Sequence, residues 1–239
     1  MRDALIIPFN EQEELVMTTD NSGAIGLKEA DAVKVPYEIV SYYSFRVAIV
    51  EALSSGAIPV SIVLQNFCGD EAWSNLNTGI QRGLAELGME NITLMGSTES
   101  NFSLSQSAIG VTIISKRQIL SEMNMKTSDS NRVALIGLPL VGEEVITQED
   151  DVVPLSVVKD ICRMRDVQVW PVGSKGVLHE LRRMVPSLDN GMVKNCTKLD
   201  LEKSGGPSTS ILVKYSKGKE SELRKVADKN FHRLWEGEV

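Results

Sequence analysis

The chain has 239 residues, of which 42% are hydrophobic and 24% are charged, the proportions of an ordinary globular protein. This composition excludes fibrous, collagen-like and disordered chains. The net charge of −7 repels nucleic-acid phosphates and anionic lipid surfaces, so general nucleic-acid binding is disfavoured.

Neither a membrane segment nor a cysteine framework is visible in the sequence. No apolar run reaches the roughly 18 residues of a membrane span, and the apolar segment at the N-terminus is too short for a signal peptide. We therefore expect a cytoplasmic protein that does not bind membranes. Cys68, Cys162 and Cys196 form no C-x-x-C pair and have no histidine nearby at metal-ligand spacing. Disulfides and structural zinc are not expected.

Strand and helix signals alternate over the first half of the chain. The β-branched run over residues 15–20 predicts a strand, and the Asn-Ser-Gly sequence at 21–23 predicts a turn into a loop. Residues 36–55 contain no proline after the first position and are followed by Gly56, which predicts a helix.

The same alternation continues to residue 115. Residues 70–87 predict an amphipathic helix that ends at Gly88, with its apolar residues on one face. Those residues are Trp73, Leu76, Ile80, Leu84 and Leu87. Strands are predicted over residues 58–67, 91–95 and 108–115. This order favours an α/β layer architecture over a helical bundle or a β-sandwich.

The chain loses its apolar periodicity over residues 116–132 and becomes rich in Lys, Ser, Asn, Asp and Met, as expected where few contacts cross. We therefore expect two αβ domains, residues 1–120 and a smaller domain of residues 121–239. In the second domain the pattern predicts strands over 133–140, 167–172 and 211–215, and helices over 155–165, 177–184 and 220–234.

Asp20 stands where the first strand is predicted to give way to a loop. Folds of the α/β class place ligand groups at such positions, and a carboxylate there suits Mg²⁺. An Asx turn made with Ser22 or Gly23 explains the residue equally well.

Glu51 falls on the same stripe of the predicted helix as Ser44, Val47 and Ala48. A carboxylate buried on that stripe requires a cation, a metal or hydrogen-bond donors. The alternative is a glutamate near the helix end that extends into water.

Two further segments carry residues suited to phosphate. Residues 96–101, Gly-Ser-Thr-Glu-Ser-Asn, offer hydroxyls, an amide and a carboxylate for phosphate oxygens or a metal, although a polar hairpin loop is the simpler interpretation. Gly205 and Gly206 would let backbone N–H groups approach a phosphate closely. Their surroundings do not match the P-loop pattern.

Three motifs resemble those of the aminoimidazole ribonucleotide synthetase-like superfamily. Residues 43–59 contain its helix-to-strand signature, an acid at Glu51 followed after four residues by Gly-Ala-Ile-Pro. Thr18-Thr19-Asp20 is similar to its early Thr-Thr-Asp strand. Residues 95–98, Met-Gly-Ser-Thr, stand in the position of its Gly-Gly-acid-Thr loop.

Members of this superfamily are ATP-dependent enzymes that move or activate through a phosphoryl group, among them the thiamine-monophosphate kinases. The short chain and the Gly-Ser-Thr-Glu-Ser-Asn segment most resemble the α-ribazole kinases, which phosphorylate the 5′-hydroxyl of α-ribazole in cobalamin salvage. The resemblance implies an ATP- and Mg²⁺-dependent phosphotransferase with a nucleoside alcohol as acceptor. It also implies a homodimer in which the N-terminal sheets form a barrel. A thiamine-monophosphate kinase-like enzyme and a nucleotide-binding regulator without turnover are the alternatives.

The resemblance also implies roles for particular residues. The acids that would bind Mg²⁺ on the nucleotide phosphates are Asp20, Glu51 and Glu99. The residues that would hold the nucleotide are Gly96, Ser97, Thr98, Asn101, Gly205 and Gly206.

One segment departs from the superfamily pattern. The Asp-x-Ser-Asp-Gly motif of the second domain corresponds to residues 172–176, Val-Gly-Ser-Lys-Gly, which lack both acids. We expect Lys175 to be the catalytic residue there, because a fixed ammonium can neutralise the charge of a transferring phosphoryl group as a metal otherwise does. A solvated loop lysine is the alternative.

Overall fold

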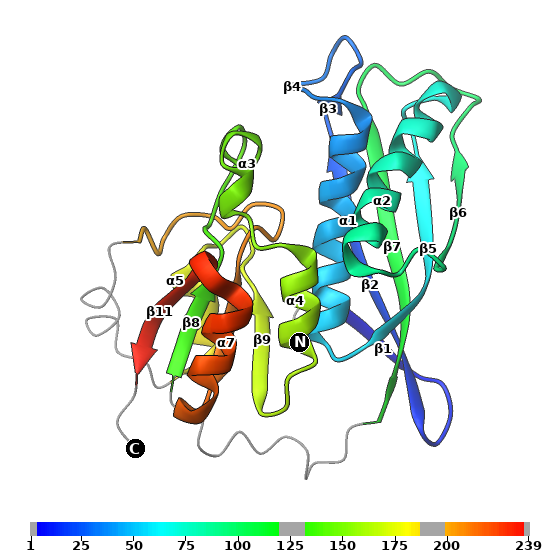
Figure 1. Ribbon diagram of the computed structural model, residues 1–239. Helices are drawn as coiled ribbons and strands as arrows, with labels where there is room; N and C mark the ends of the chain where they lie inside the picture. Colours follow the sequence, from blue (N-terminus) through cyan, green and yellow to red (C-terminus); the bar gives the residue numbers. More distant parts are fainter. Residues whose placement is uncertain (1–3, 120–131, 187–198, 237–239) are drawn as a thin grey trace. The chain divides into compact units, whose positions relative to one another are not determined.

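The computed structural model describes residues 4–119, 132–186 and 199–236 of the chain (Figure 1). The chain divides into two compact units, unit 1 of residues 1–119 and unit 2 of residues 120–239. Most of the connection predicted over residues 116–132 lies outside the described residues. Within the described ranges, no helix has the length and apolar character needed to cross a membrane. Both units combine helices with a β-sheet, which confirms a mixed α/β class.

Unit 1 is built on a five-stranded sheet in the order β1-β2-β7-β5-β6. Its strands are β1 (Ala4–Pro8), β2 (Glu13–Gly23), β5 (Ile58–Asn66), β6 (Thr93–Thr98) and β7 (Ala108–Gln118). Neighbouring strands run antiparallel except β5 and β6, which run parallel. A short parallel pair, β3 (Ile25–Gly26) and β4 (Val33–Lys34), follows β2.

Strand β2 continues through residues 21–23, so the turn predicted there is wrong. These residues pair with β7, from Asn21 opposite Gly110 to Gly23 opposite Ala108. Ladder hydrogen bonds to a strand of equal length outweigh the local turn preference of Asn, Ser and Gly. Asp20 therefore lies inside a strand and not in a loop.

Strand β6 also extends past its predicted end at residue 95. Gly96, Ser97 and Thr98 pair in parallel with the last three residues of β5. The loop predicted over residues 96–101 therefore begins at Glu99. The local preference of small polar residues for a loop again gives way to pairing with a neighbouring strand.

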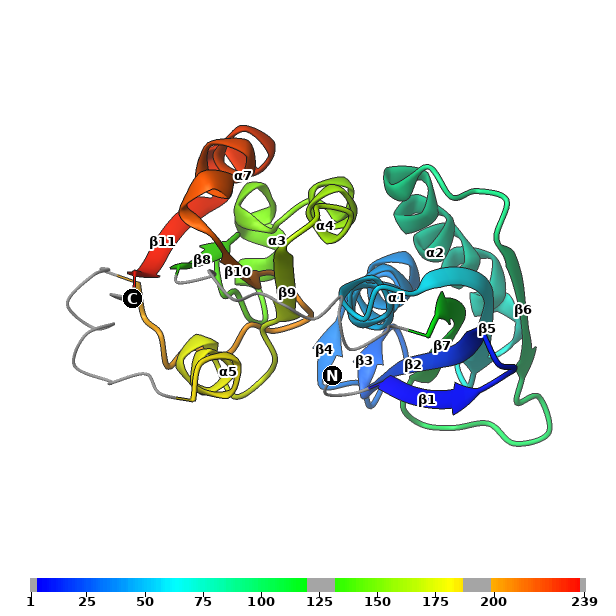
Figure 2. The same cartoon turned by 90° about the horizontal axis from the view of Figure 1, so that it is seen from below.

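Two helices cover one face of this sheet (Figure 1, Figure 2). Helix α1 (Tyr37–Ser54) packs on β2, β7 and β5, and helix α2 (Trp73–Leu87) packs against α1 after the 3-10 turn η1 (Asp70–Ala72). Both helices confirm the predictions. Helix α2 ends at Gly88, whose φ of 60° is left-handed.

Gly79 on α2 faces α1 at a close approach of the two helices. A Cβ added to Gly79 would overlap the carbonyl oxygen of Glu38 and the Oγ of Ser41, both on α1. The helices can approach this closely because α2 has no side chain at this point.

We expect Gly79→Ala to lower the free energy of unfolding by about 1–3 kcal/mol, because overpacking outweighs the helix propensity that alanine adds. Urea unfolding measures the change. Gly23→Ala is the matched control, since a Cβ there meets no atom within 4 Å. Equal stabilities of the two variants would contradict the close packing.

Unit 2 contains a four-stranded antiparallel sheet in the order β11-β8-β10-β9. Its strands are β8 (Arg132–Ile136), β9 (Val167–Pro171), β10 (Ile211–Tyr215) and β11 (Phe231–Glu236). Its helices are α3 (Glu144–Thr147), α4 (Leu155–Cys162), α5 (Val177–Met184) and α7 (Glu220–Ala227). Its 3-10 turns are η3 (Glu149–Asp151), η4 (Lys217–Lys219) and η5 (Asp228–Asn230). Figure 2 shows α4 and α7 on one face of the sheet and α5 on the other, so all five residues of β8 are buried.

The helix predicted over residues 220–234 is wrong in its second half, because residues 231–236 form β11. Phe231 and Leu234 are both buried, and a spacing of three residues is typical of a helix. In the structure the pairing with β8 shifts register between Arg233 and Trp235. This bulge places Phe231 and Leu234 on the same side of the strand, although they are three residues apart.

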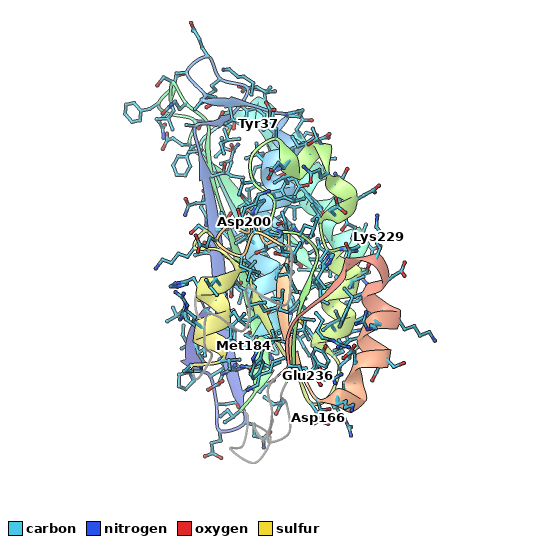
Figure 3. All side chains as sticks on the ribbon, turned by 90° about the vertical axis from the view of Figure 1, so that its left-hand side faces the viewer. Tyr37, Asp166, Met184, Asp200, Lys229 and Glu236 are labelled. Atoms are coloured by element: carbon cyan, nitrogen blue, oxygen red, sulfur yellow. The ribbon has the colours of Figure 1, made fainter. Side chains whose placement is uncertain are left out.

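A buried ion cluster joins β8, β11 and α7. Glu220 is 8% exposed and accepts hydrogen bonds from Arg132, from Arg233 and, at 2.9 Å, from Arg224. Arg132 also pairs with Glu236 (labelled in Figure 3). Burial alone would raise the pKa of Glu220, but the three guanidinium groups outweigh burial and lower the pKa to about 2.

The lowered pKa predicts acid sensitivity. The Glu220 carboxylate stabilises the fold above its ordinary pKa of 4.5, and this stabilisation is lost as the pH falls toward 2. We expect a loss on the order of 1–3 kcal/mol from this group between about pH 6 and pH 2.5. Urea unfolding across that range measures it, with Glu220→Gln as the variant that should show a shallower pH dependence. Identical pH dependence in both proteins would exclude this cluster as the cause.

Candidate functional site

The parallel strands β5 and β6 end at the same edge of the unit 1 sheet, and η1 and α2 begin there. Proteins with α/β folds bind ligands beyond the carboxyl ends of parallel strands. At this edge lies an open pocket of about 460 Å³. It is lined by Asp70, Trp73, Gly96, Ser97 and Thr98. Three of the residues predicted to hold a nucleotide therefore share one pocket.

Gly96 is required by the packing beside this pocket. A Cβ on Gly96 would overlap the carbonyl oxygen of Leu64 on β5 and lie 2.9 Å from Cη2 of Trp73. The indole of Trp73 can therefore approach the β6 backbone only because position 96 has no side chain. The hydroxyl-bearing residues Ser97 and Thr98 follow directly along β6.

The sequence pattern pointed to neither Asp70 nor Asn66 as a functional residue. Asp70 brings a carboxylate into the pocket. Asn66, 1% exposed, binds the Thr98 hydroxyl at 3.0 Å from behind the pocket. One sequence feature could have identified them. Asn66 is a polar residue at the end of an apolar strand, and the acidic Asp70 follows four residues later.

Asp20 lies on the face of β2 that α1 covers. Burial raises the pKa of Asp20 to about 6, against the lowering effect of hydrogen bonds from the Ser44 hydroxyl and the Asn21 backbone. Neither partner carries a positive charge. The ionised carboxylate is therefore only partly compensated, and a bound cation would stabilise it.

Glu51 and Glu99 lie elsewhere in unit 1. Glu51 is on α1, two turns or roughly 10 Å along the helix from Ser44, and is partly exposed, whereas Ser44 and Ala48 are buried. Glu99 follows β6, and its carboxylate accepts hydrogen bonds from the backbone N–H groups of Asn101, at 2.8 Å, and of the next residue, at 3.3 Å. Glu51 on a helix and Glu99 in the segment after a strand therefore lie in different surroundings.

The three predicted metal ligands do not form one cluster. Asp20 and Gly96 lie in one row across the sheet with β7 and β5 between them, three strand spacings or about 14 Å apart. The part of the chain that the structure describes contains no group of three His, Cys, Asp or Glu residues arranged to bind a metal. An Mg²⁺ held mainly by nucleotide phosphates and water needs only one or two carboxylates. Asp70, which lines the pocket, fits that role. Metal binding by Asp20, Glu51 or Glu99 stays a prediction, and as these acids lie they would not share one ion.

Asp31 holds the loops at this edge in place. Its carboxylate accepts hydrogen bonds from the backbone N–H groups of Lys28, at 2.8 Å, and Ser107, at 2.7 Å, and from the Ser107 hydroxyl, at 2.7 Å. The same hydroxyl lies 3.1 Å from the phenol of Tyr37 at the start of α1 (Figure 3). Burial would raise the pKa of Asp31, but these hydrogen bonds lower it. The segments that follow β2 and precede β7 are thereby fixed to α1.

Unit 2 brings together the second group of predicted residues. The turn over residues 173–176 carries Lys175, whose side chain is exposed. This turn lies against the glycine loop, because the Gly205 N–H donates to the Gly173 carbonyl at 3.1 Å. Beside it, Lys203 pairs with Glu144 at 2.7 Å.

Packing accounts for both glycines of this loop. A Cβ on Gly205 would lie 2.6 Å from the carbonyl oxygen of Val172, and one on Gly206 would overlap the carbonyl oxygen of Leu140. The Gly206 N–H donates to the Ser204 hydroxyl at 3.2 Å. A phosphate would therefore compete with existing hydrogen bonds, and nucleotide binding by this loop stays a prediction.

No family model and no curated protein matches the sequence. Solved structures match the fold. The thiamine monophosphate kinase of Aquifex aeolicus has a TM-score of 0.62 at 12% identity, over 100% of this chain and 89% of that chain. AaThiL complexed with AMPPCP and TMP has a TM-score of 0.59 at 12% identity, over 98% and 84%.

The hydrogenase maturation protein HypE gives a TM-score of 0.60 at 11% identity, over 99% of this chain and 83% of that chain. At such identities the likeness establishes the fold alone. That fold is the one expected from the motifs at Asp20, Glu51 and residues 95–98.

We expect Asp20→Asn to raise the free energy of unfolding at about pH 8 by on the order of 1–2 kcal/mol, because the variant carries no partly buried charge. The cost of the wild-type carboxylate develops as the pH rises from its ordinary pKa of 3.8 to about 6 and is constant above that, so the difference between the two proteins should be small at and below about pH 4. Thermal or urea unfolding at both pH values measures it. A less stable Asp20→Asn protein at about pH 8 would contradict an uncompensated charge.

Proposed function

We propose that the protein is an ATP-dependent small-molecule kinase that phosphorylates an alcohol, most specifically the 5′-hydroxyl of a nucleoside such as α-ribazole. The main support is the pocket at the ends of β5 and β6, because Gly96, Ser97 and Thr98 line it and belong to the segment 95–98 that resembles the Gly-Gly-acid-Thr loop. The fold shared with AaThiL, which is complexed with AMPPCP and TMP, adds support for ATP as the phosphoryl donor.

In the proposed reaction the acceptor hydroxyl attacks the γ-phosphorus of ATP, its proton is released and ADP leaves. Such transfer depends on alignment and charge neutralisation more than on covalent help from the protein. Thr98 is suited to bind a phosphate oxygen through its hydroxyl, Ser97 also lines the pocket, and Trp73 forms a wall of it. Asp70, which lines the pocket, would hold Mg²⁺ there, and Mg²⁺ supplies positive charge on the phosphates when bound.

A homodimer is part of the proposal. Among the described residues, no helix covers the face of the unit 1 sheet opposite α1 and α2 (Figure 2). The strand register places a series of apolar residues on that face, among them Leu5, Ile7, Leu15, Met17, Ile58, Val63, Met95 and Ile114. Leu5 is 60% exposed and Met95 is 59% exposed. Exposed apolar surface of this kind favours burial against a partner, here the same face of a second copy.

A single-turnover assay with γ-labelled ATP, Mg²⁺ and a panel of acceptors tests the proposal. Transfer of label to the 5′-hydroxyl of α-ribazole supports it, whereas transfer to thiamine monophosphate assigns the thiamine-monophosphate kinase reaction instead. Binding of ATP without transfer to any acceptor would make the protein a nucleotide-binding regulator. The absence of ATP binding would contradict the whole proposal.

Lys175 is proposed to contact the nucleotide or product phosphate. We expect Lys175→Ala to lower kcat/KM by about 10- to 1000-fold, the scale for losing one preorganised charge or donor. Lys175→Asp should be worse, because it places a carboxylate against the phosphates. Steady-state kinetics at several Mg²⁺ concentrations measure both variants.

Lys225→Ala on α7 is a control that removes a lysine far from these loops in sequence. Kinetics within about twofold of the wild type for Lys175→Ala would make Lys175 a solvated loop residue. Activity of Lys175→Asp restored by raised Mg²⁺ would show that a metal, and not the ammonium, belongs at this position.

A further inference from the structure

The side chain of Asn66 lies behind the pocket and uses both ends of its amide. Its Oδ1 accepts a hydrogen bond from the Cys68 backbone N–H at 2.8 Å. Its Nδ2 donates to the Gly69 carbonyl oxygen at 2.9 Å and to the Thr98 hydroxyl at 3.0 Å. With 1% of its surface exposed, the side chain has no access to a ligand of its own.

The two backbone partners determine the orientation of this amide. A backbone N–H only donates and a carbonyl oxygen only accepts, so Oδ1 must face Cys68 and Nδ2 must face Gly69. The second N–H of Nδ2 then points to Thr98, whose hydroxyl oxygen must accept it. A hydroxyl has one proton, so the proton of Thr98 points away from Asn66.

We propose that Asn66 is a positioning residue that makes Thr98 a hydrogen-bond donor toward the pocket, and that the acceptor is a phosphate oxygen of bound ATP. The inference rests on the proposed function, which assigns ATP to this pocket. A phosphate oxygen carries negative charge and accepts hydrogen bonds, so it matches a hydroxyl whose proton faces it. Mg²⁺ would instead bind the second lone pair of the hydroxyl oxygen, which Asn66 leaves free, so binding with and without Mg²⁺ separates the two ligands.

The same residue also fixes the position of the donor. The backbone carbonyl of Asn66 accepts the Glu99 N–H at 2.8 Å, immediately after Thr98. Its side chain meanwhile holds Gly69, the residue before Asp70. Asn66 thus connects the end of β6 to the start of η1, the two segments that carry the polar groups of the pocket. A donor held in this way loses little conformational entropy when the phosphate binds.

The first test compares ATP binding by wild type and Thr98→Val, measured by calorimetry with Mg²⁺ and again in EDTA. Valine keeps the size and β-branching of threonine, so the strand is preserved. We expect about a tenfold weaker affinity under both conditions, because the lost partner is a phosphate oxygen. Thr98→Ser, which keeps the hydroxyl, should bind within about threefold of wild type. A loss seen only with Mg²⁺ would make Thr98 a metal ligand and overturn the proposal.

The second test is a double-mutant cycle on ATP affinity with Asn66→Ala and Thr98→Val. If Asn66 acts through the Thr98 hydroxyl, Asn66→Ala weakens binding in the wild-type background and changes it less than about twofold in the Thr98→Val background. Equal losses in both backgrounds would make Asn66 a purely structural residue and overturn its positioning role. If Asn66→Ala does not fold, the isosteric Asn66→Asp replaces it in the same cycle. A loss of ATP affinity caused only by the added negative charge would be equal with and without the Thr98 hydroxyl, whereas a loss that acts through the hydroxyl would appear only where threonine is present.

Failure of the proposed function gives a different result. A wild-type protein that binds no ATP overturns both the function and this inference. A wild type that binds ATP as tightly as Thr98→Val does leaves the kinase proposal standing and overturns the donor role of Thr98 alone.

Discussion

The parallel pairing of β5 with β6 is the constraint on which the rest of unit 1 depends. Parallel strands require a crossover, and η1 with α2 supplies it, so two strand ends and a helix start meet at one edge of the sheet. Because of this pairing, Gly96, Ser97 and Thr98 belong to a strand, although the sequence predicted a loop there. Asn66 then bonds to both sides of the crossover. The pocket is a consequence of this geometry.

The buried Glu220 of unit 2 and the partly buried Asp20 of unit 1 have opposite electrostatic surroundings. Three guanidinium groups surround Glu220 and lower its pKa to about 2, which is the arrangement of a structural ion cluster. Asp20 receives hydrogen bonds only from neutral groups, and burial raises its pKa to about 6. The Glu220 carboxylate is compensated by cations of the chain itself, whereas the Asp20 carboxylate is only partly compensated, by neutral donors. Metal binding by Asp20 stays a prediction.

Helices and strands were predicted correctly from the sequence where one local pattern was clear. Helix α2 combines an apolar stripe with a glycine stop, and its end agrees with the prediction, whereas its first three predicted residues form the 3-10 turn η1. Prediction failed where pairing overrode local preference, as at residues 21–23, and where a bulge gave β11 a helical spacing. The pocket residues in β6 were found through a motif. Asn66 was not found, because its role depends on partners that only the folded sheet brings together.

A crystal structure of the protein with AMPPCP and Mg²⁺ tests the central claim most directly, namely that the β5–β6 edge binds the phosphates of ATP. The account predicts phosphate oxygens within hydrogen-bond distance of the Thr98 hydroxyl, with Asn66 still bound to Thr98 and Mg²⁺ ligated by Asp70. Triphosphate bound elsewhere, with the pocket of Asp70 and Thr98 filled only by water, would contradict it.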